Sequence, residues 1–394
     1  MTLHTPEFAA DPHSAYQAMR DHHGPLVPLE LAPGIPATLI IGYREALQVL
    51  SDPLHFPADP RAWQSGRAAS CPVLPTMGWR PGAPRTTDPE YARNRGATTD
   101  CLNQVDLYTL RVTVERIASK RIDSFCEAGS ADLLNQYAIP LTVEVLHEVL
   151  GFGPESGRRA FSGLIALRNA ADAAAAQRGD EMLTAAIAET VAGKQVAPGT
   201  DVISWLLQHG AGADEKALVD QVATLYVTGT EPTWNLIANT VLLLASDDRF
   251  GGELLGGALS IRDAIDEVLF TDPPVANSCF SYPRQPQIIG NTWLPVDQPV
   301  LISLAACNAD PAAADGDRTG NRSHLSWGAG AHSCPAQSVA MVIAQEALDQ
   351  LLDALPEVRL AVPETQLQWR TGGFHRALAA LPVRFPPSPP LNLG

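Results

Sequence analysis

Apolar residues recur at helical spacing over most of the chain and at the spacing of short strands in two smaller regions. Residues 88–250 follow a mainly helical periodicity and include a long, mostly apolar helix expected over Ala217–Ser246. Short apolar runs broken by Pro and Gly, at Pro25–Tyr43 and Pro273–Leu304, predict strands instead. The pattern therefore predicts a mainly α fold with a minor β-sheet region.

A glycine-rich loop brings one cysteine to the start of another amphipathic helix. Over Val339–Leu352 the apolar residues fall on one face, and Cys334 lies just before this helix. There the first-turn N–H groups and the helix dipole favour a thiolate over a thiol. Gly328 and Gly330, which follow Trp327, allow the backbone to approach a flat ligand closely. Two interpretations remain open: Cys334 is an iron ligand, or it is a small buried hydrophobe.

Composition narrows the class of protein. The chain has 394 residues, of which 45% are hydrophobic, so it can bury a large core. The sequence shows no clear domain boundary, and we expect one domain over residues 1–394 with a proline-rich tail at 386–394. No stretch is long and apolar enough to span a bilayer, and the first residues lack the pattern of a secretory leader. We therefore expect a soluble, cytoplasmic protein.

Charge and cysteine spacing exclude several functions. A formal net charge of −16, from 27 basic and 43 acidic residues, opposes binding to nucleic acid or to an anionic membrane. The cysteines are Cys71, Cys101, Cys126, Cys279, Cys307 and Cys334. Their scattered spacing argues against both a disulfide framework and a zinc site.

One helical stretch carries a local cluster of basic residues. Its members are Arg111, Arg116, Lys120 and Arg121. They lie opposite an apolar face, which is typical of a solvated outer helix surface. The alternative interpretation is a docking patch that steers an acidic redox partner.

The loop from Trp327 to Cys334 resembles the Phe-x-x-Gly-x-x-x-Cys haem-binding loop of the cytochrome P450 family, with Trp327 in the aromatic place. Weaker matches follow in the family's order. They are Asp11-Pro12-His13, the segment Pro89 to Arg95, Trp369-Arg370 and Leu381 to Phe385. The resemblance covers nearly the whole chain. It implies a P450-like fold, haem b as the cofactor and Cys334 as the iron ligand.

The resemblance also implies which residues surround the haem. His332 and Arg95 match positions that bind the haem propionates in the family, and Tyr91 stands in the place of a histidine there. The hydroxyl of Tyr91 can still donate a hydrogen bond to a propionate. Ala336 replaces a glycine beside the porphyrin and is small enough to be tolerated. For Arg95 a surface position is an equally open interpretation, and for His332 a capping role.

On the oxygen side of the haem, the family has a Gly-x-acid-Thr segment in its long central helix. Here Gly229 and Glu231 match the glycine and the acid, while Pro232 occupies the place of the threonine. Pro232 lacks a hydroxyl, and its ring is expected to bend the helix. Thr233 points about 100° away, so Thr230 or Glu231, through a water, is the more plausible proton relay. A weakened relay predicts slow or uncoupled oxygen chemistry.

A second departure concerns the family's Glu-x-x-Arg pair. Glu267 matches the glutamate, but Phe270 stands where the arginine is expected. A buried carboxylate without a partner is costly, so Glu267 is expected to be exposed, protonated or paired with Arg318 or Arg322. Phe270 can instead seal this site by apolar packing. The departure resembles a small bacterial branch of the family.

These features imply a haem-thiolate monooxygenase that inserts one oxygen atom of O2 into an apolar small molecule. Electrons would come from a separate ferredoxin and ferredoxin reductase. Two alternatives remain open: a haem-binding regulatory partner with impaired oxygenase activity, and peroxide-driven or non-oxygenase haem-thiolate chemistry. The stretch Pro57–Pro84 and the helices between Ser156 and Gly193 are expected to form the lid of the pocket.

Overall fold

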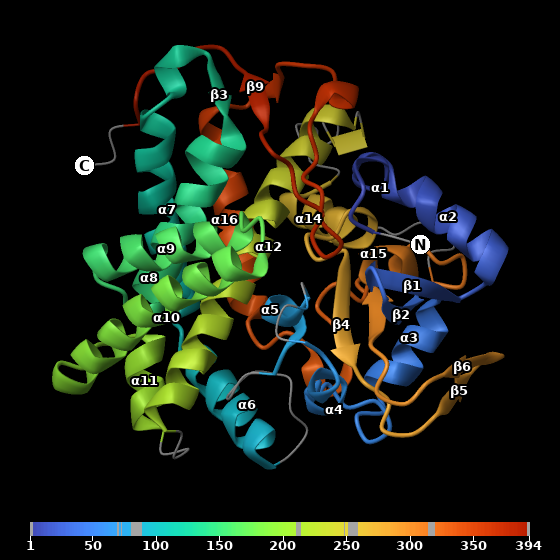
Figure 1. The fold of residues 1–394 in the computed structure, drawn as a ribbon. Helices are drawn as coiled ribbons and strands as arrows, with labels where there is room; N and C mark the ends of the chain where they lie inside the picture. The colour runs from blue at the N-terminus through green and yellow to red at the C-terminus, as the bar shows by residue number, and fades with distance from the viewer. Residues whose placement is uncertain are drawn as a thin grey trace.

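The structure, a computed structural model, is a helix-rich body with small sheets along one side (Figure 1). It describes residues 3–68, 71, 73–79, 89–209, 214–247, 249–250, 259–313 and 320–391. The predicted fold class is confirmed. None of the helices in these ranges combines the length and the apolar character that crossing a membrane requires.

The helices and strands have the following bounds. The helices are α1 Pro6–Ala10, α2 Pro12–His23, α3 Tyr43–Leu50, α4 Arg61–Ser65, α5 Leu74–Met77, α6 Pro89–Leu102, α7 Leu107–Asp123, α8 Ile139–Leu150, α9 Pro154–Arg168, α10 Ala173–Val196, α11 Val202–Gln208, α12 Glu215–Ser246, α14 Ile261–Thr271, α15 Leu304–Asn308 and α16 Gln337–Ala354. The strands are β1 Leu26–Ala32, β2 Ile35–Ile40, β3 Ser130–Asp132, β4 Asn277–Ser281, β5 Gln287–Ile289, β6 Thr292–Leu294, β7 Val300–Ser303, β8 Arg359–Leu360 and β9 Pro382–Arg384.

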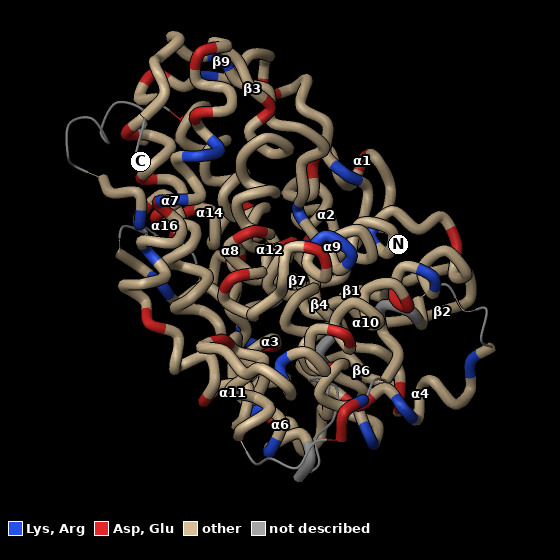
Figure 2. The backbone as a smooth tube through the Cα atoms, turned by 90° about the vertical axis from the view of Figure 1, so that its left-hand side faces the viewer, with Lys and Arg blue, Asp and Glu red and all other residues tan. Residues whose placement is uncertain are grey.

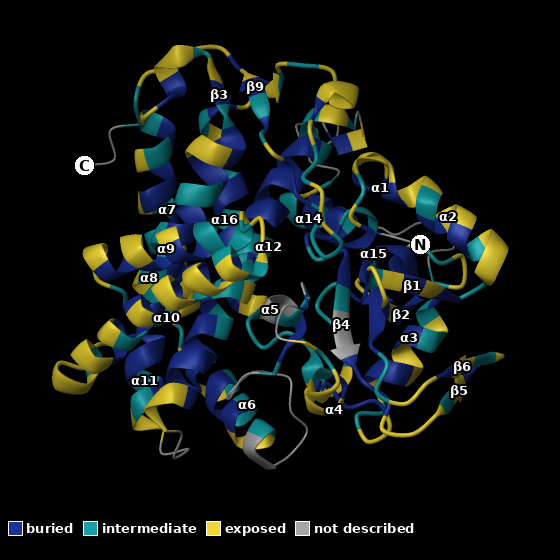
Figure 3. Ribbon diagram, viewed as in Figure 1, coloured by how far each residue is buried: buried dark blue, intermediate teal, exposed yellow. Residues whose placement is uncertain are grey.

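The core is built around the central helix α12. This helix is capped by Asp214, whose side chain accepts a hydrogen bond from the Ala217 N–H, and most of its residues are buried. It packs against α8, α10, α14 and α16. Figure 3 shows the central helices largely buried and the outward faces of α9 to α11 exposed. The apolar pattern thus predicted both the long central helix and α16 to within about two residues at each end.

Pro232 lies inside α12 without ending it. The two neighbouring hydroxyls both donate to carbonyls one turn back: Thr230 Oγ1 to Tyr226 O, and Thr233 Oγ1 to Gly229 O at 2.6 Å. Both hydroxyls are therefore hydrogen-bonded to the backbone of their own helix. The helix is continuous across the proline, and the bend expected there remains a prediction.

The main sheet joins segments from the two ends of the chain. Its strand order is β1-β2-β7-β4, and β2 pairs with β7 in parallel, with Thr38 opposite Val300. The other pairs in this sheet are antiparallel. Both predicted strand regions therefore contribute to one sheet, which Figure 1 shows beside the helical body. A smaller sheet, β3-β9-β8, and the hairpin β5-β6 complete the β structure of the described chain.

The expected proline-rich tail is docked rather than loose as far as residue 391. The Ser388 N–H donates to Cys126 O at 3.0 Å, and the Leu391 N–H donates to the Asp123 carboxylate at 2.7 Å. These contacts attach the chain's end to the C-terminal end of α7.

Three of the four basic residues clustered on α7 form ion pairs within the molecule. Arg116 donates to Glu148 of α8 at 2.6 Å, Arg121 pairs with Glu144 of the same helix, and Arg111 lies 3.5 Å from Glu346 of α16. Figure 2 shows acidic positions beside the basic ones around α7. The ion pairs favour the interpretation of a solvated outer face over that of a docking patch.

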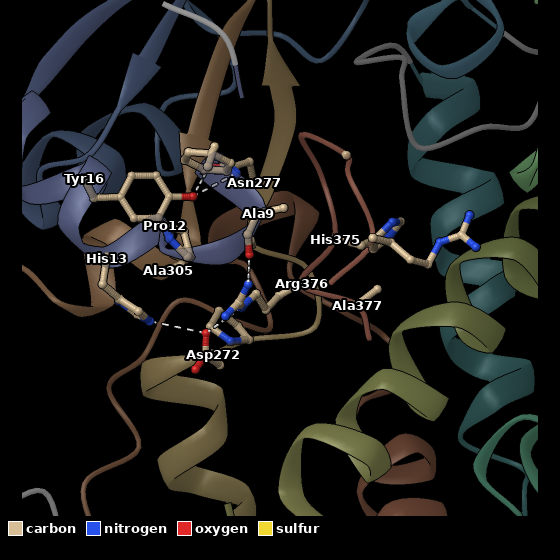
Figure 4. Close-up of a pocket in the computed structure, with 15 residues that line it drawn as sticks. Ala9, Pro12, His13, Tyr16, Asp272, Asn277, Ala305, His375, Arg376 and Ala377 are labelled. Carbon is tan, nitrogen blue, oxygen red and sulfur yellow. Dashed lines mark hydrogen bonds and ion pairs between the residues drawn. The ribbon is translucent and has the colours of Figure 1, made fainter. Parts of the chain in front are cut away.

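The N-terminal helices are attached to the end of α14 through a charged cluster (Figure 4). His13 Nε2 lies 3.3 Å from Asp272 Oδ1, and Arg376 Nε donates to the same oxygen at 3.0 Å. Arg376 also donates to the backbone oxygen of Ala9. The hydrogen bond to Asp272 raises the pKa of His13, against the opposing effect of burial.

This raised pKa predicts a pH-dependent stabilisation. A histidine whose pKa is higher in the folded than in the unfolded state stabilises the fold when it is protonated. This stabilisation is complete below the ordinary pKa of 6.5, and it is lost as the pH rises through the folded-state pKa. Because the pair is partly exposed, His13→Gln should lower the free energy of unfolding by at most about 1 kcal/mol at pH 6 and by less at pH 8.5. Urea unfolding at both pH values measures this. His23→Gln, at an exposed histidine of the same helix, is the control, and a difference that grows with pH would contradict the assignment.

Candidate functional site

The loop before α16 is folded tightly around Cys334. The Cys334 N–H donates to Trp327 O at 2.7 Å, and the Gly328 N–H donates to Leu325 O at 2.7 Å. Gly328 and Gly330 both have positive φ, at 69° and 65°. A Cβ at Gly330 would overlap the backbone oxygen of Leu50, so this glycine is required by a close approach as well as by its φ.

Cys334 itself is half-buried. Burial raises the pKa of its thiol, and this effect outweighs the hydrogen bond from the Ala336 backbone and the positive charge of Arg95, which both lower it. The position before α16 therefore acts against desolvation, and the preference for a thiolate remains a prediction. The helix begins only at Gln337, and desolvation disfavours the charged form.

Three residues from distant parts of the sequence meet beside this loop. Tyr91 and Arg95 lie on α6, and His332 ends the single 3-10 turn before the cysteine. The Tyr91 hydroxyl lies 2.9 Å from His332 Nδ1, and the Arg95 guanidinium donates to the backbone oxygen of Ser333. The structure thus brings together the residues that the sequence predicted as propionate ligands. Arg95 is half-buried against the loop, so the alternative of a free surface position does not hold.

His332 also supplies a test of whether a charged ligand fits here. Its Nε2 is buried and has no hydrogen-bond partner among the residues that the structure describes. Burial, with a contribution from Arg95, lowers the pKa of His332 to about 4. A buried ring nitrogen without a partner is costly unless a ligand supplies one. The site therefore fits a group with acceptor oxygens, as a haem propionate has.

On α12, the five residues of the predicted oxygen-side segment have different environments. Thr230 is fully buried and Thr233 is nearly so, and each hydroxyl proton is donated to a carbonyl. Space for an added Cβ remains at Gly229, where the nearest atom is 3.7 Å away in Leu146. The Glu231 carboxylate instead accepts a hydrogen bond at 2.8 Å from Arg168 Nε of α9. Both side chains of this ion pair are almost buried, with exposures of 11% for Arg168 and 12% for Glu231.

A cavity of about 540 Å³ lies between α9, α10, one face of α12 and residues 370–377. Thr228 and Glu231 contribute polar atoms from α12. The helices predicted as a lid, between Ser156 and Gly193, do border this cavity. In the other predicted lid segment, Pro57–Pro84, none of the described residues lines it.

The buried acid of α14 is Asp266, a residue that the sequence analysis did not single out. Arg262 Nε and Arg322 Nε donate to its carboxylate at 3.0 and 2.9 Å. Arg322 comes from the loop ahead of Cys334, so this contact attaches α14 to that loop. The spacing of Arg262 and Asp266, one helical turn apart, was the signal available in the sequence.

Glu267 has a different partner from those expected. Its carboxylate lies 3.4 Å from the Arg249 guanidinium. Arg322 binds Asp266 instead, and Arg318 lies outside the described residues. Phe270 is fully buried, as expected for a residue that seals this site by packing, and its ring meets that of His324 edge to face at 5.1 Å.

Comparisons with known proteins agree with this architecture. No family model matches the chain. It is 30% identical to cytochrome P450 107B1 of Saccharopolyspora erythraea, over 96% of this chain and 96% of that protein. It is 26% identical to 6-deoxyerythronolide B hydroxylase of the same organism, over 97% and 98% of the two chains. The solved structure of CYP154C4 from Streptomyces has a TM-score of 0.89 and 24% identity, over 98% of both chains.

Proposed function

Because this chain belongs to the cytochrome P450 family, we propose that its haem-thiolate centre is built on Cys334. The protein is a P450 monooxygenase that hydroxylates small molecules, and its cofactor is haem with a cysteine thiolate ligand. When bound, the haem supplies O2 activation, with the thiolate favouring O–O cleavage. The observation that carries the assignment to Cys334 is the loop itself, where Gly330 packs directly on Leu50 and presents the cysteine at the start of α16.

Arg95, Tyr91 and His332 are proposed to hold the haem propionates. The unpartnered Nε2 of His332 supports this, because a propionate oxygen next to it would remove the cost of the buried nitrogen. The Tyr91 hydroxyl, 2.9 Å from the other ring nitrogen, would fix the orientation of the imidazole. Trp327, Gly328, Gly330 and Ala336 would form the floor of the haem site.

On the expected oxygen side of the haem, the residues that could move a proton are Thr230, Glu231 and Thr233. Gly229 leaves space beside them. Glu231 is proposed as the acid that exchanges protons with solvent. Its carboxylate is held in place by Arg168, whose Nε donates to it at 2.8 Å. Pro232 provides no hydroxyl, so proton delivery is expected to be less efficient than with a threonine in this place.

Pro232→Thr should therefore improve the coupling of electron use to product. The added hydroxyl would lie where the family has its threonine. We expect about a tenfold rise in product per NADPH consumed, less than the roughly hundredfold or larger effects typical of general acid–base groups, because Thr230 and Glu231 remain. Pro232→Ala is the matched control, because it removes the ring without adding a hydroxyl. If both variants change coupling equally, the helix geometry and not the hydroxyl is responsible.

We further propose that the chain forms a single P450-type domain and receives electrons from a separate ferredoxin and its reductase. One apolar cluster runs from Ala97 to Phe385, which supports a single domain. We also propose that the chain belongs to an atypical branch of the family that lacks the Glu-x-x-Arg arginine. Phe270, three residues after Glu267, supports this.

One experiment separates this function from the two alternatives. Purified protein is reduced in the presence of carbon monoxide, and NADPH consumption and product are then followed with surrogate ferredoxin and reductase. A red-shifted Soret band with product at ordinary rates supports the monooxygenase. The same band without product under electron supply supports a regulatory role, and product only with added hydrogen peroxide supports peroxide-driven chemistry.

A further inference from the structure

The 540 Å³ cavity has one charged region in otherwise mostly apolar walls. Two arginines line this region: Arg168, from the end of α9, and Arg370, from the C-terminal segment. Arg168 Nε binds Glu231, but its Nη2 is buried and has no hydrogen-bond partner among the described residues. The Arg168 guanidinium also lies 5.2 Å from the ring of Trp234, which fixes its plane.

Arg370 is the second cation of this region. Its Nη2 donates to Asn169 Oδ1 at 3.0 Å, a neutral acceptor. Burial lowers the pKa of Arg370, and the positive charge of Arg168 lowers it further, while Glu231 is the acid whose charge raises it. The two positive charges thus repel each other, and the Glu231 carboxylate attracts both of them.

His375, the remaining titratable group of this region, adds no charge. Burial lowers its pKa, and so do both arginines. Figure 4 shows its side chain directed away from the cluster of His13, Asp272 and Arg376. Asp172 and Asp180 also line the cavity, from α10, but neither is among the charges that act on Arg370 or His375. The charged groups that act on these two side chains are the arginines and one acid, Glu231.

The rest of the wall is suited to a hydrocarbon. Leu164 and Leu167 from α9, Ala223 and Val227 from α12, and Phe374 from the C-terminal segment line it. A substrate that is wholly apolar would cover two guanidinium groups without satisfying them, which costs free energy for every unpaired buried donor.

We propose that the substrate is an apolar carboxylic acid whose carboxylate is bound by Arg168 and Arg370. This inference rests on the proposed monooxygenase function and specifies its substrate class. A guanidinium fits a carboxylate in a two-pronged geometry, and the unpartnered Nη2 of Arg168 together with Arg370 supplies donors on two sides. Arg168 binds Glu231 through Nε alone, so its Nη2 and the Arg370 guanidinium can donate to a second carboxylate. The hydrocarbon part would then lie along the leucine and alanine walls.

The test compares dodecanoic acid with methyl dodecanoate, which has the same chain without the charge. Isothermal titration calorimetry on the haem-loaded protein at pH 7.5 measures both affinities. We expect the acid to bind at least tenfold more tightly than the ester. Arg370→Met should weaken binding of the acid about tenfold and leave the affinity for the ester unchanged. Arg370→Lys should weaken binding of the acid by an intermediate factor.

Arg178→Met is the matched control, because it removes one positive charge from the exposed side of α10 and should leave the preference intact. The lysine variant keeps the test valid if the methionine variant does not fold. Equal affinities for acid and ester in the unchanged protein, or no measurable binding of the acid, would overturn the proposal. The reduced carbon monoxide spectrum of the same sample reports on the haem-thiolate centre separately, so a failure of the substrate class is distinguished from a failure of the proposed function.

Discussion

Cys334→Ala should abolish the red-shifted Soret band of the reduced, carbon monoxide-bound protein. That band arises from a thiolate opposite the carbon monoxide, and among the described cysteines only Cys334 lies on the loop before α16. The other four in this group are buried in the body of the protein. The loss should be complete rather than partial, because none of the other described cysteines lies on this loop to replace the ligand.

Cys126→Ala is the control for this experiment. Cys126 is fully buried near the end of α7, so its substitution also removes a sulfur but leaves the loop untouched. The band should persist in this variant. Survival of the band in Cys334→Ala, or its loss in Cys126→Ala with the fold retained, would show that the ligand is misassigned.

Asp266→Ala should lower the free energy of unfolding by about 3 kcal/mol. The Asp266 carboxylate is 6% exposed and accepts hydrogen bonds from both Arg262 and Arg322. Its removal leaves two guanidinium groups without their partner. Both are more exposed than the acid, at 29% and 57%, so water can solvate them in part, and the cost falls at the low end for a broken buried pair.

Urea unfolding of the haem-loaded protein measures this loss, and Glu148→Ala provides the comparison. Glu148 pairs with Arg116 at the surface, where both side chains are at least half-exposed, and its removal should cost less than about 1 kcal/mol. Because Arg322 lies in the loop ahead of Cys334, the Asp266 variant should also retain less haem after gel filtration. A cost for Asp266→Ala no larger than that for Glu148→Ala would rule out the cluster as a structural anchor.

The sequence was sufficient for the features that depend on local pattern. The apolar periodicity predicted α12 and α16, and the glycines before Cys334 predicted a close backbone approach, which Gly330 makes to Leu50. Tyr91, Arg95 and His332 could be associated only through resemblance to a family, because nothing in residue spacing relates α6 to a loop more than 200 residues later. Their contacts confirm that association.

The errors concern partners chosen by tertiary packing. Arg318 and Arg322 were the cations expected for Glu267 if it is paired, whereas Asp266, one residue earlier, points inward and binds Arg322. A shift of one residue turns a helix by about 100°, so periodicity leaves such a choice open when two acids are adjacent. The pairing of Arg168 with Glu231 could likewise not be predicted from the sequence, because only the packing of α9 against α12 brings the two residues together.

The parallel pairing of β2 with β7 also determines when this protein can become complete during its synthesis. Thr38 lies opposite Val300, and the Leu50 oxygen meets Gly330, so the first fifty residues find their partners only after most of the chain has left the ribosome. Contacts so far apart in sequence form slowly. Until β7 is made, the β2 edge lacks its partner strand, and an unpaired strand edge is prone to aggregate. Cys334 follows both contacts in the sequence, so the site proposed for the haem can be complete only once most of the chain has been synthesised.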